Sequence, residues 1–271
     1  MMATLGAYAF FLGAIVGSFL NVVIHRYPLG ESIVFPPSHC PLCNYKIRPW
    51  DNVPIISYLL LLGRCRSCRS PITLRYPLIE LGNGLFYLAI YLNTGVSWLF
   101  PLVAAVVSSL LVLIYIDLDI QILPDVIDLP GIVLGLGIGA LSSSLPTGTL
   151  TLSESVIDAA LGAALGGGVL LFIALVYQRL RGIEGMGMGD VKMMAMIGAV
   201  TGWRFVLPVL LLSSIAGTVV AIPSAIRSRH GMQLALPFGV FLGLGTLAVM
   251  FFGDRLTEWY TLLTYGPSLP S

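Results

Sequence analysis

The sequence predicts an all-α polytopic membrane protein, with about eight transmembrane helices and a polar insert between the first and the second. Two observations predict this class. Hydrophobic residues make up 57% of the 271 residues and charged residues only 10%, and the mean hydropathy of +0.93 lies far above that of soluble domains. Apolar runs that approach the length of a membrane span recur along the chain. The net charge of +1 gives no indication of a nucleic-acid partner.

Eight apolar segments are candidates for these helices. They lie at residues 5–23, 78–92, 98–115, 127–141, 156–177, 193–203, 206–226 and 236–252. The second, fourth and sixth are short and interrupted by glycine, which leaves the count open by one or two. The first segment has no basic residue before it and no small-residue cleavage site after it, so we expect a retained helix rather than a signal peptide.

The basic residues predict the orientation of these helices. Most of them fall in the connections after the first, fifth and seventh segments: Arg26, Lys46, Arg48, Arg64, Arg66, Arg69, Arg75, Arg179, Arg181, Arg227 and Arg229. With eight spans these connections share one side, which the positive-inside rule assigns to the cytoplasm. Both termini are then outside, with only Arg204 and Arg255 among the basic residues there.

The chain divides into four regions, which are a first helix (1–25), a polar insert (26–75), a membrane core (76–254) and a short tail (255–271). The insert contains all four cysteines, paired as Cys40-Pro-Leu-Cys43 and Cys65-Arg-Ser-Cys68 with 21 residues between the pairs. Two such pairs match a tetrahedral zinc site with four thiolate ligands. Two disulfides or four unrelated thiols are the alternatives, and a cytoplasmic insert disfavours disulfides. Because four thiolates leave no open position, the predicted zinc stabilises the insert rather than catalysing a reaction.

Glycine motifs in the apolar segments predict close helix packing. Gly135, Gly137 and Gly139 look like a dinucleotide-binding loop, but they lie inside a span, without the strand-turn-helix context of such a loop. Gly162 and Gly166 have GxxxG spacing. Residues 142–155, rich in Ser, Thr and Leu, predict an external loop with no chemistry.

Three carboxylates follow the third apolar segment. Asp119 and Asp125 fit ordinary solvated residues at a membrane boundary, and Asp125, after Pro124, could cap the next helix. Asp117 directly abuts the apolar run, where a carboxylate is costly and is therefore a functional-site candidate. The residues themselves favour Asp117 modestly and leave the other two open.

A fourth carboxylate, Asp190, precedes the sixth segment. Gly187 and Gly189 flank it, so backbone or substrate can approach it closely, and Lys192 is a cation that could steer or pair with a carboxylate. The alternative is that Asp190 caps the helix, which explains the aspartate but not the two glycines. The predicted topology places Asp117 and Asp190 at the same cytoplasmic boundary. Two adjacent carboxyls tend to share one proton, as in aspartic proteases, where one activates a water and the other donates to the scissile carbonyl.

Four blocks in this order resemble the type IV prepilin peptidases, membrane aspartic proteases of the GxGD class. They are GSFLNVVIHR at residues 17–26, the two cysteine pairs, IDLDIQILPD at 116–125 and EGMGMGDVK at 184–192. The resemblance covers nearly the whole chain. It implies that Asp117 and Asp190 are the catalytic pair, with Gly187, Gly189 and Lys192 as supporting motif residues.

The same resemblance implies the substrate and the location. Substrates would be type IV prepilins or pseudopilins, cleaved after a glycine at the cytoplasmic boundary of the bacterial inner membrane. Similar proteins with the cysteine-bearing insert also N-methylate the new amino terminus with S-adenosylmethionine. The sequence shows no motif for that cofactor, so its binding residues are unknown, as are the oligomeric state and the particular pilin or secretion system.

Three other hypotheses stay open. The protein could be a peptidase without methylation. Buried carboxylates also suit a proton- or cation-coupled transporter, although that class explains neither the cysteine module nor the glycines beside Asp190. A membrane scaffold that binds partners through the cysteine module is the third.

Overall fold

The computed structural model describes residues 2–144, 148–183, 185–227 and 236–265. Within these ranges the chain is helical and contains no β-strand beyond two isolated bridges in the insert. The predicted all-α class is therefore confirmed for the described residues.

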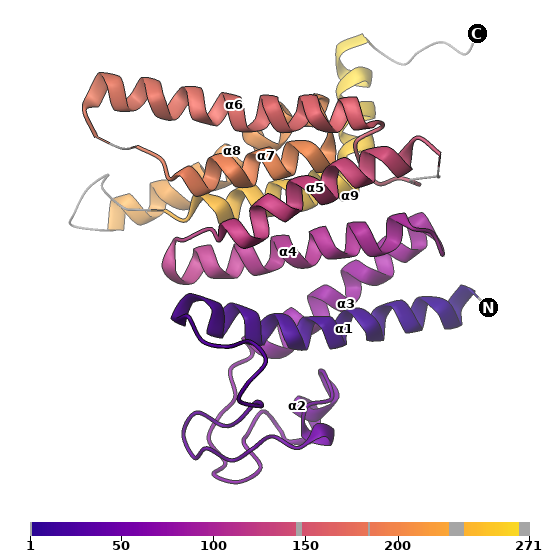
Figure 1. Cartoon of the computed structure of the whole chain (residues 1–271), viewed down its shortest axis with the longest axis vertical. Helices are drawn as coiled ribbons and strands as arrows, with labels where there is room; N and C mark the ends of the chain where they lie inside the picture. Colours follow the sequence, from indigo (N-terminus) through magenta and orange to yellow (C-terminus); the bar gives the residue numbers. More distant parts are fainter. Residues whose placement is uncertain (1, 145–147, 184, 228–235, 266–271) are drawn as a thin grey trace.

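Eight long helices form the main body of the molecule. They are α1 (Met2–Arg26), α3 (Arg75–Thr94), α4 (Leu99–Ile120), α5 (Asp125–Ser142), α6 (Val156–Arg181), α7 (Met188–Thr201), α8 (Trp203–Arg227) and α9 (Phe238–Tyr265). Figure 1 shows these helices side by side, with successive helices running in opposite directions. The insert between α1 and α3 contains only the five-residue α2 (Ile56–Leu60) and a short 3-10 turn, Pro49–Asp51; another such turn, Tyr27–Leu29, directly follows α1.

Six of the eight helices in the described part of the chain are long and apolar enough to cross a membrane: α1, α4, α5, α6, α8 and α9. Each of the eight predicted apolar segments falls mainly on one long helix, although residues 193–203 run past the end of α7 to the first residue of α8. The predicted eight spans are not confirmed. Helix α7 has 14 residues, so it rises only about 21 Å, less than the hydrocarbon core of a bilayer. Helix α3 is long enough but carries Arg75, Glu80 and Asn83.

Several boundaries differ from the prediction. The sixth segment was expected to begin at residue 193, whereas α7 begins five residues earlier and ends at Thr201, before Gly202 with φ +82°. Helix α9 continues to Tyr265, well past residue 252 and into the region expected as a tail. The last residues of that tail, 266–271, lie outside the described residues.

Helices α4 and α7 are the most enclosed. Nine of the 14 residues of α7 are buried, and they pack with α4 and α9 in one hydrophobic cluster that contains Leu110, Met193, Met194, Ile197 and Leu242. This arrangement places the ends of α4 and α7, where Asp117 and Asp190 lie, next to α9.

A buried polar network joins the first three long helices. The Asn83 side chain on α3 donates to the Gly13 carbonyl of α1 at 2.7 Å and accepts from the Ser108 hydroxyl of α4 at 3.1 Å. A Cβ at Gly13 would lie 2.7 Å from the Asn83 carbonyl oxygen, so the close contact between α1 and α3 requires glycine there. The network fixes α1, and the insert that follows it, against the bundle.

The glycine motifs act mainly in packing, as predicted. A Cβ at Gly135 would lie 2.6 Å from the Ala199 Cβ on α7, and one at Gly139 would lie 2.5 Å from the Ser155 carbonyl oxygen. Gly162 directly abuts Gly198, and a Cβ at Gly166 would lie 2.5 Å from the Met194 carbonyl oxygen. Only Gly137 has ordinary space around it.

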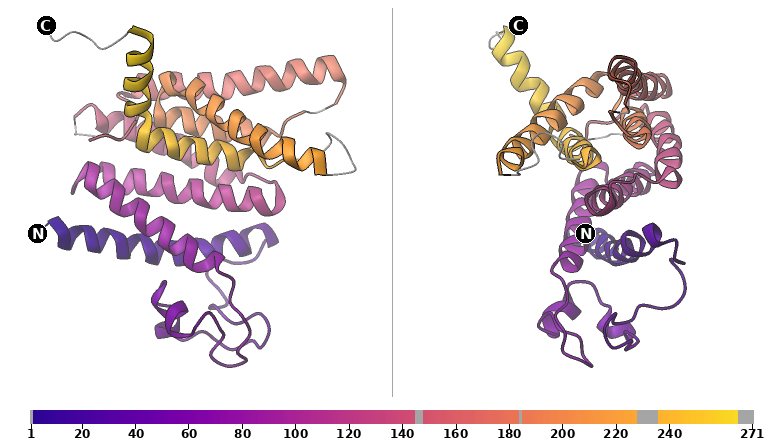
Figure 2. Two further views of the ribbon diagram at one scale, coloured as in Figure 1. Left: turned by 180° about the vertical axis from the view of Figure 1, so that it is seen from behind. Right: turned by 90° about the vertical axis from the view of Figure 1, so that its left-hand side faces the viewer.

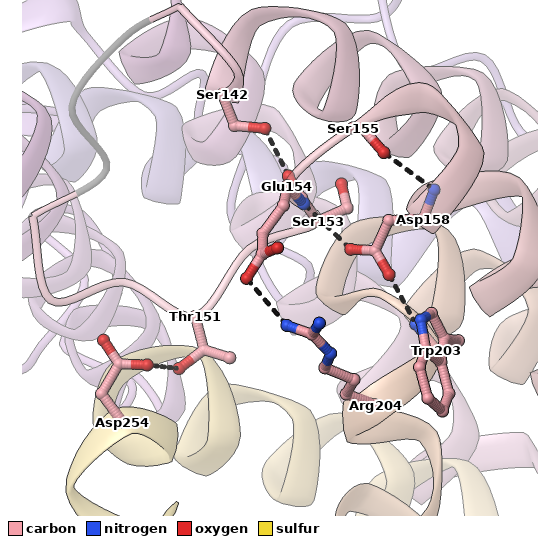
Figure 3. Close-up of polar contacts among 9 residues, drawn as sticks. All are labelled: Ser142, Thr151, Ser153, Glu154, Ser155, Asp158, Trp203, Arg204 and Asp254. Atoms are coloured by element: carbon pink, nitrogen blue, oxygen red, sulfur yellow. Dashed lines mark hydrogen bonds and ion pairs between the residues drawn. The ribbon is translucent and has the colours of Figure 1, made fainter.

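The connection before α6 is not a free loop. The Thr151 amide donates to the Met250 carbonyl at 2.8 Å, and the Ser153 amide donates to the Val200 carbonyl at 2.8 Å. Figure 3 shows Asp158 accepting from the Glu154 and Trp203 amides, at 2.9 and 3.3 Å, and Glu154 paired with Arg204 at 3.1 Å. These contacts close the end of the bundle opposite the insert.

The connections are arranged in two groups. The C-terminal ends of α1, α4, α6 and α8 lie at one end of the bundle, and the insert lies beside the half of α1 that is nearer to this end (Figures 1 and 2). The N-terminal end of α1 and the C-terminal end of α9 lie at the other (Figure 2). Asp117, close to the end of α4, and Asp190, at the start of α7, therefore belong to the insert end.

Candidate active site and metal centre

Asp117 lies in the last turn of α4 and is 4% exposed. Its Oδ2 accepts the Val240 amide of α9 at 3.0 Å. Helix α4 ends three residues later, at Ile120. The next residue, Gln121, takes a left-handed conformation with φ 56°, and its amide donates to the Asp117 carbonyl at 2.9 Å. No basic side chain in the described ranges pairs with Asp117, so this carboxylate is held by backbone alone.

The neighbouring carboxylates have cationic partners. Asp119 is paired with Arg75 at 2.7 Å, and Asp125 is paired with Lys192 at 2.7 Å. The proposed capping role of Asp125 is wrong, because the N-cap of α5 is Pro124 and has no side-chain hydrogen bond. Lys192 does pair with a carboxylate, and that carboxylate is Asp125. Among the three carboxylates near the end of α4, only Asp117 is buried.

Asp190 is the third residue of α7, in the turn where the helix dipole favours negative charge. The N-cap position belongs to Gly187, so the structure does not support the alternative that Asp190 caps the helix. A Cβ at Gly189 would lie 2.8 Å from the Leu123 Cβ, which explains that glycine by close approach. Gly187 has no comparable contact, and neither glycine has a positive φ, so the backbone conformation does not require glycine at either position.

Two contacts bring the ends of α4 and α7 together on α9. Gly243 of α9 touches Ile114, and a Cβ there would lie 3.5 Å from the Met193 Cε. One turn from these residues toward the insert end are Asp117 on α4 and Asp190 on α7. Leu123 packs on Gly189, and a Cβ at Gly239 would lie 2.9 Å from the Asp117 Oδ2 and 3.1 Å from the Leu123 Cδ1.

The two carboxyls therefore share one site. Asp117 lies within electrostatic range of Asp190, while no hydrogen bond within the described structure joins them. Such a pair can hold and activate a water between two carboxyl groups, one acting as base and the other as acid.

A third carboxylate near this site was missed in the sequence. Asp128 on α5 is fully buried, and both of its oxygens lack a hydrogen-bond partner. It lies within electrostatic range of Asp125, Lys192 and Asp190. The signal was available, because Asp128 follows Asp125 by three residues and so shares its helix face.

The four cysteines of the insert gather into one cluster. Their Sγ atoms all lie within 4.8 Å of one another, and all four thiols are free. The Cys40 and Cys68 sulfurs are 3.8 Å apart and those of Cys43 and Cys65 are 4.0 Å apart. Four sulfurs about 2.3 Å from a tetrahedral metal would be separated by about 3.8 Å. The cluster therefore fits a metal ion bound by four thiolates, and the disulfide alternative is not what the structure contains.

Matching turns build the two halves of this cluster. Each cysteine pair is followed by a residue with positive φ, Asn44 (φ 54°) or Arg69 (φ 61°). The Asn44 amide donates to the Cys40 carbonyl, and the Arg69 amide donates to the Cys65 carbonyl. These turns direct the sulfurs to one point.

Hydrogen bonds favour the thiolate form of two ligands. The backbone amides of Cys43 and Leu42 lower the pKa of Cys40 to about 6. The Ser70 hydroxyl lowers the pKa of Cys68 below its usual value. Thiolates are the form that a metal binds. The pair of Asp51 with Arg66, at 2.6 Å, ties the Pro49–Asp51 turn to the second cysteine pair.

Comparison with known proteins assigns the family. Residues 11–94 match the family model described as the Bacterial Peptidase A24 N-terminal domain, and residues 104–222 match the Type IV leader peptidase family. The chain belongs to the type IV leader peptidase family.

Relatives in this family resemble the chain over nearly its whole length. It is 37% identical to a prepilin leader peptidase/N-methyltransferase of Burkholderia pseudomallei, over 95% of the chain and 87% of the relative. Identity to the proteins of the same name from Aeromonas hydrophila and Pseudomonas aeruginosa is 37% and 36%, over 93% and 92% of the chain and 92% and 91% of the relatives. No solved structure matches.

The two segments matched by the family models cover different parts of the structure. The first spans most of α1, the insert and α3; the second contains Asp117 and Asp190. Helix α9, which supplies the Val240 amide to Asp117, lies beyond both.

Proposed function

We propose that the protein removes the leader peptide from type IV prepilins or pseudopilins and uses Asp117 and Asp190 as its catalytic pair. Family membership supports the reaction. One structural observation supports the residues: the end of α4 and the start of α7 lie at the same level on α9, with Asp117 buried there and Asp190 within its electrostatic range. The transporter hypothesis is not favoured by the family.

The proposed chemistry needs no covalent intermediate. One carboxyl, ionised, takes a proton from water while the other, protonated, donates to the carbonyl oxygen of the scissile bond. The Val240 amide anchors one oxygen of Asp117 and leaves the other for the reaction. The close packing of Leu123 between Gly189 and Gly239 holds the two helix ends in register.

We also propose the membrane placement given by the positive-inside rule. All eight long helices would cross or enter the bilayer, with α3 and α7 shielded by their neighbours. The insert and both aspartates would face the cytoplasm, and both termini would lie outside. The enzyme would then meet the cytoplasmic leader of a prepilin at the membrane boundary.

The four-thiolate cluster is proposed to hold zinc. Zinc is the metal most suited to four cysteine ligands in a closed tetrahedral shell, and in such a site it stabilises the fold. The residues present fit it: Cys40, Cys43, Cys65 and Cys68 lie at suitable separations.

A second activity is proposed from the names of the relatives. The new amino terminus of the cleaved pilin would receive a methyl group from S-adenosylmethionine. The test below distinguishes this bifunctional enzyme from a peptidase without methylation.

The test uses the purified protein, a prepilin and S-adenosylmethionine. Mass spectrometry of the pilin N terminus should show loss of the leader after a glycine and, only with S-adenosylmethionine present, the gain of one methyl group. Cleavage without methylation would leave a peptidase alone. An intact leader, under conditions where the enzyme is folded, would contradict the proposed function.

A further inference from the structure

A cavity lies between the second half of α1 and the insert. Its volume is about 440 Å³, within the range of sites that bind small molecules. It is much larger than the roughly 30 Å³ that one water occupies in the liquid. Its walls come from α1, both cysteine turns and the start of α3, and they include Asn21, Tyr45, Asp51, Tyr58, Tyr76 and Glu80.

Two buried polar atoms on this wall have no partner. They are the Asn21 Oδ1 and the Tyr45 hydroxyl. The Asn21 amide nitrogen is already used, since it donates to the Tyr76 carbonyl at 3.2 Å. Buried polar atoms are nearly always hydrogen-bonded in proteins, and no protein group uses the hydrogen-bonding capacity of these two atoms beside the cavity. Asn21 also belongs to the block at residues 17–26, which the peptidase site does not use.

The remaining wall offers a carboxylate and aromatic rings beside the basic residues His25, Arg26 and Arg66. Glu80 is 8% exposed and accepts the Ile55 amide at 2.7 Å, and no basic side chain in the described ranges forms an ion pair with it. Tyr45, Tyr58 and Tyr76 add three aromatic rings. Aromatic faces and a carboxylate attract a sulfonium, and an amide oxygen accepts from an adenine amino group or a ribose hydroxyl.

The cavity adjoins the end of the bundle that holds the catalytic pair. Asn21 bonds the Tyr76 carbonyl, and the preceding residue, Arg75, pairs with Asp119 at 2.7 Å. Asp119 is two residues from Asp117. The two sites are thus linked through a short series of contacts at one membrane boundary.

We propose that this cavity is the site that binds S-adenosylmethionine. The inference rests on the proposed methyltransferase function and gives it a location. In the transfer, the free amine nitrogen of the pilin bonds the methyl carbon, the carbon–sulfur bond breaks, and the sulfur keeps its electron pair. One proton passes from the nitrogen to solvent, and S-adenosylhomocysteine remains.

The test is equilibrium binding of S-adenosylhomocysteine and S-adenosylmethionine to the full-length protein in detergent, by titration calorimetry. Tyr45→Phe removes only the unpartnered hydroxyl. The Kd of this variant for both compounds should be about three- to tenfold higher than that of wild type, the effect of one hydrogen bond. Val22→Phe places a larger side chain on the cavity wall and should weaken binding by more than about tenfold. Tyr8→Phe, at an exposed position of α1 near its other end, is the matched control and should bind like wild type.

Metal content and prepilin cleavage, measured on the same samples, show whether each variant is folded. Wild-type affinity in both cavity variants would overturn the location and leave the methyltransferase function intact. A raised KM for prepilin in the cavity variants, with unchanged cofactor binding, would instead assign the cavity to the leader peptide. If the wild-type protein neither binds the cofactor nor methylates pilin, the methyltransferase function itself fails.

Discussion

Gly239 shows how a single residue can set the position of the proposed catalytic carboxylate. A Cβ there would lie 2.9 Å from the Asp117 Oδ2 and 3.1 Å from the Asp117 Cγ. The adjacent Val240 supplies the amide that Asp117 accepts. Glycine therefore lets α9 approach Asp117 closely enough to hold it.

Replacing this glycine should affect catalysis more than folding. Gly239→Ala should displace the Asp117 carboxylate and reduce the rate of prepilin cleavage by about 10- to 100-fold, because small misplacements of catalytic groups are costly. The rate is measured with purified enzyme. Gly82→Ala is the control, since a Cβ at Gly82 meets no atom within 4 Å. Equal activity of the two variants would show that Gly239 does not position Asp117.

Asp51 allows a pH test in the insert, outside the membrane. The hydrogen bond from Arg66 holds the pKa of Asp51 below its usual range, so the pair stabilises the fold at every pH above the unfolded carboxyl pKa of about 3.9. Asp51→Asn should lower the thermal midpoint equally at pH 6 and pH 8. The difference from wild type should shrink only as the pH falls through the folded pKa. A destabilisation that doubles between pH 8 and pH 6 would contradict this assignment; metal content is followed at each pH.

At the scale of elements, the contact between α6 and α7 fixes the helix that carries Asp190. Gly162 abuts Gly198 backbone to backbone, and Gly166 fits against Met194 of α7. The GxxxG spacing indicated such packing, but it could not identify α7 as the partner, because small residues permit a close approach without specifying the helix that makes it.

This contact predicts different effects on stability when two glycines of α6 are replaced by alanine. Gly162→Ala should destabilise the protein by about 1–3 kcal/mol, because the new methyl group overlaps the α7 backbone. Gly168→Ala should leave stability unchanged or slightly raised, since a Cβ there meets no atom within 4 Å and alanine favours helix. Thermal unfolding in detergent measures both. A Gly162→Ala variant as stable as Gly168→Ala would contradict the packing.

At the scale of the whole molecule, the chain alternates between two ends of a bundle. The insert lies beside the C-terminal half of α1, nearer to one end, and the connection between α3 and α4 lies at the other end. This alternation agrees with the distribution of basic residues and places Asp117 and Asp190 at the insert end.

Impermeant thiol labelling tests the proposed topology. Val96, 84% exposed between α3 and α4, and Leu29, 63% exposed after α1, are expected on opposite sides. Val96→Cys should be labelled in cells whose outer membrane is permeabilised, and Leu29→Cys only after the inner membrane is opened. Unmodified protein controls for its own four cysteines. Labelling of both positions from the same side would show that α3 does not cross.

The sequence predicted the long helices and the cysteine cluster better than it predicted the contacts around Asp117 and Asp190. Apolar runs and the two CxxC pairs are local signals, so they can be recognised in the sequence without knowledge of tertiary contacts. The capping role of Asp125 was wrong because a cap depends on where the helix begins, and the N-cap residue of α5 is Pro124. The Val240 amide was missed because it lies 123 residues from Asp117 in the sequence. The importance of Asp128 was missed because it arises from burial, which its spacing from Asp125 does not show.

The most direct test of the central claim is the cleavage rate of the purified Asp117→Asn, Asp190→Asn and Asp119→Asn variants on a prepilin. Each of the first two should lose at least about a hundredfold in rate, because acid–base catalysis by a carboxyl is removed. Asp119→Asn, which breaks only the exposed pair with Arg75, should stay within a few-fold of wild type. Wild-type rates in either Asp117→Asn or Asp190→Asn would contradict the proposed aspartate pair.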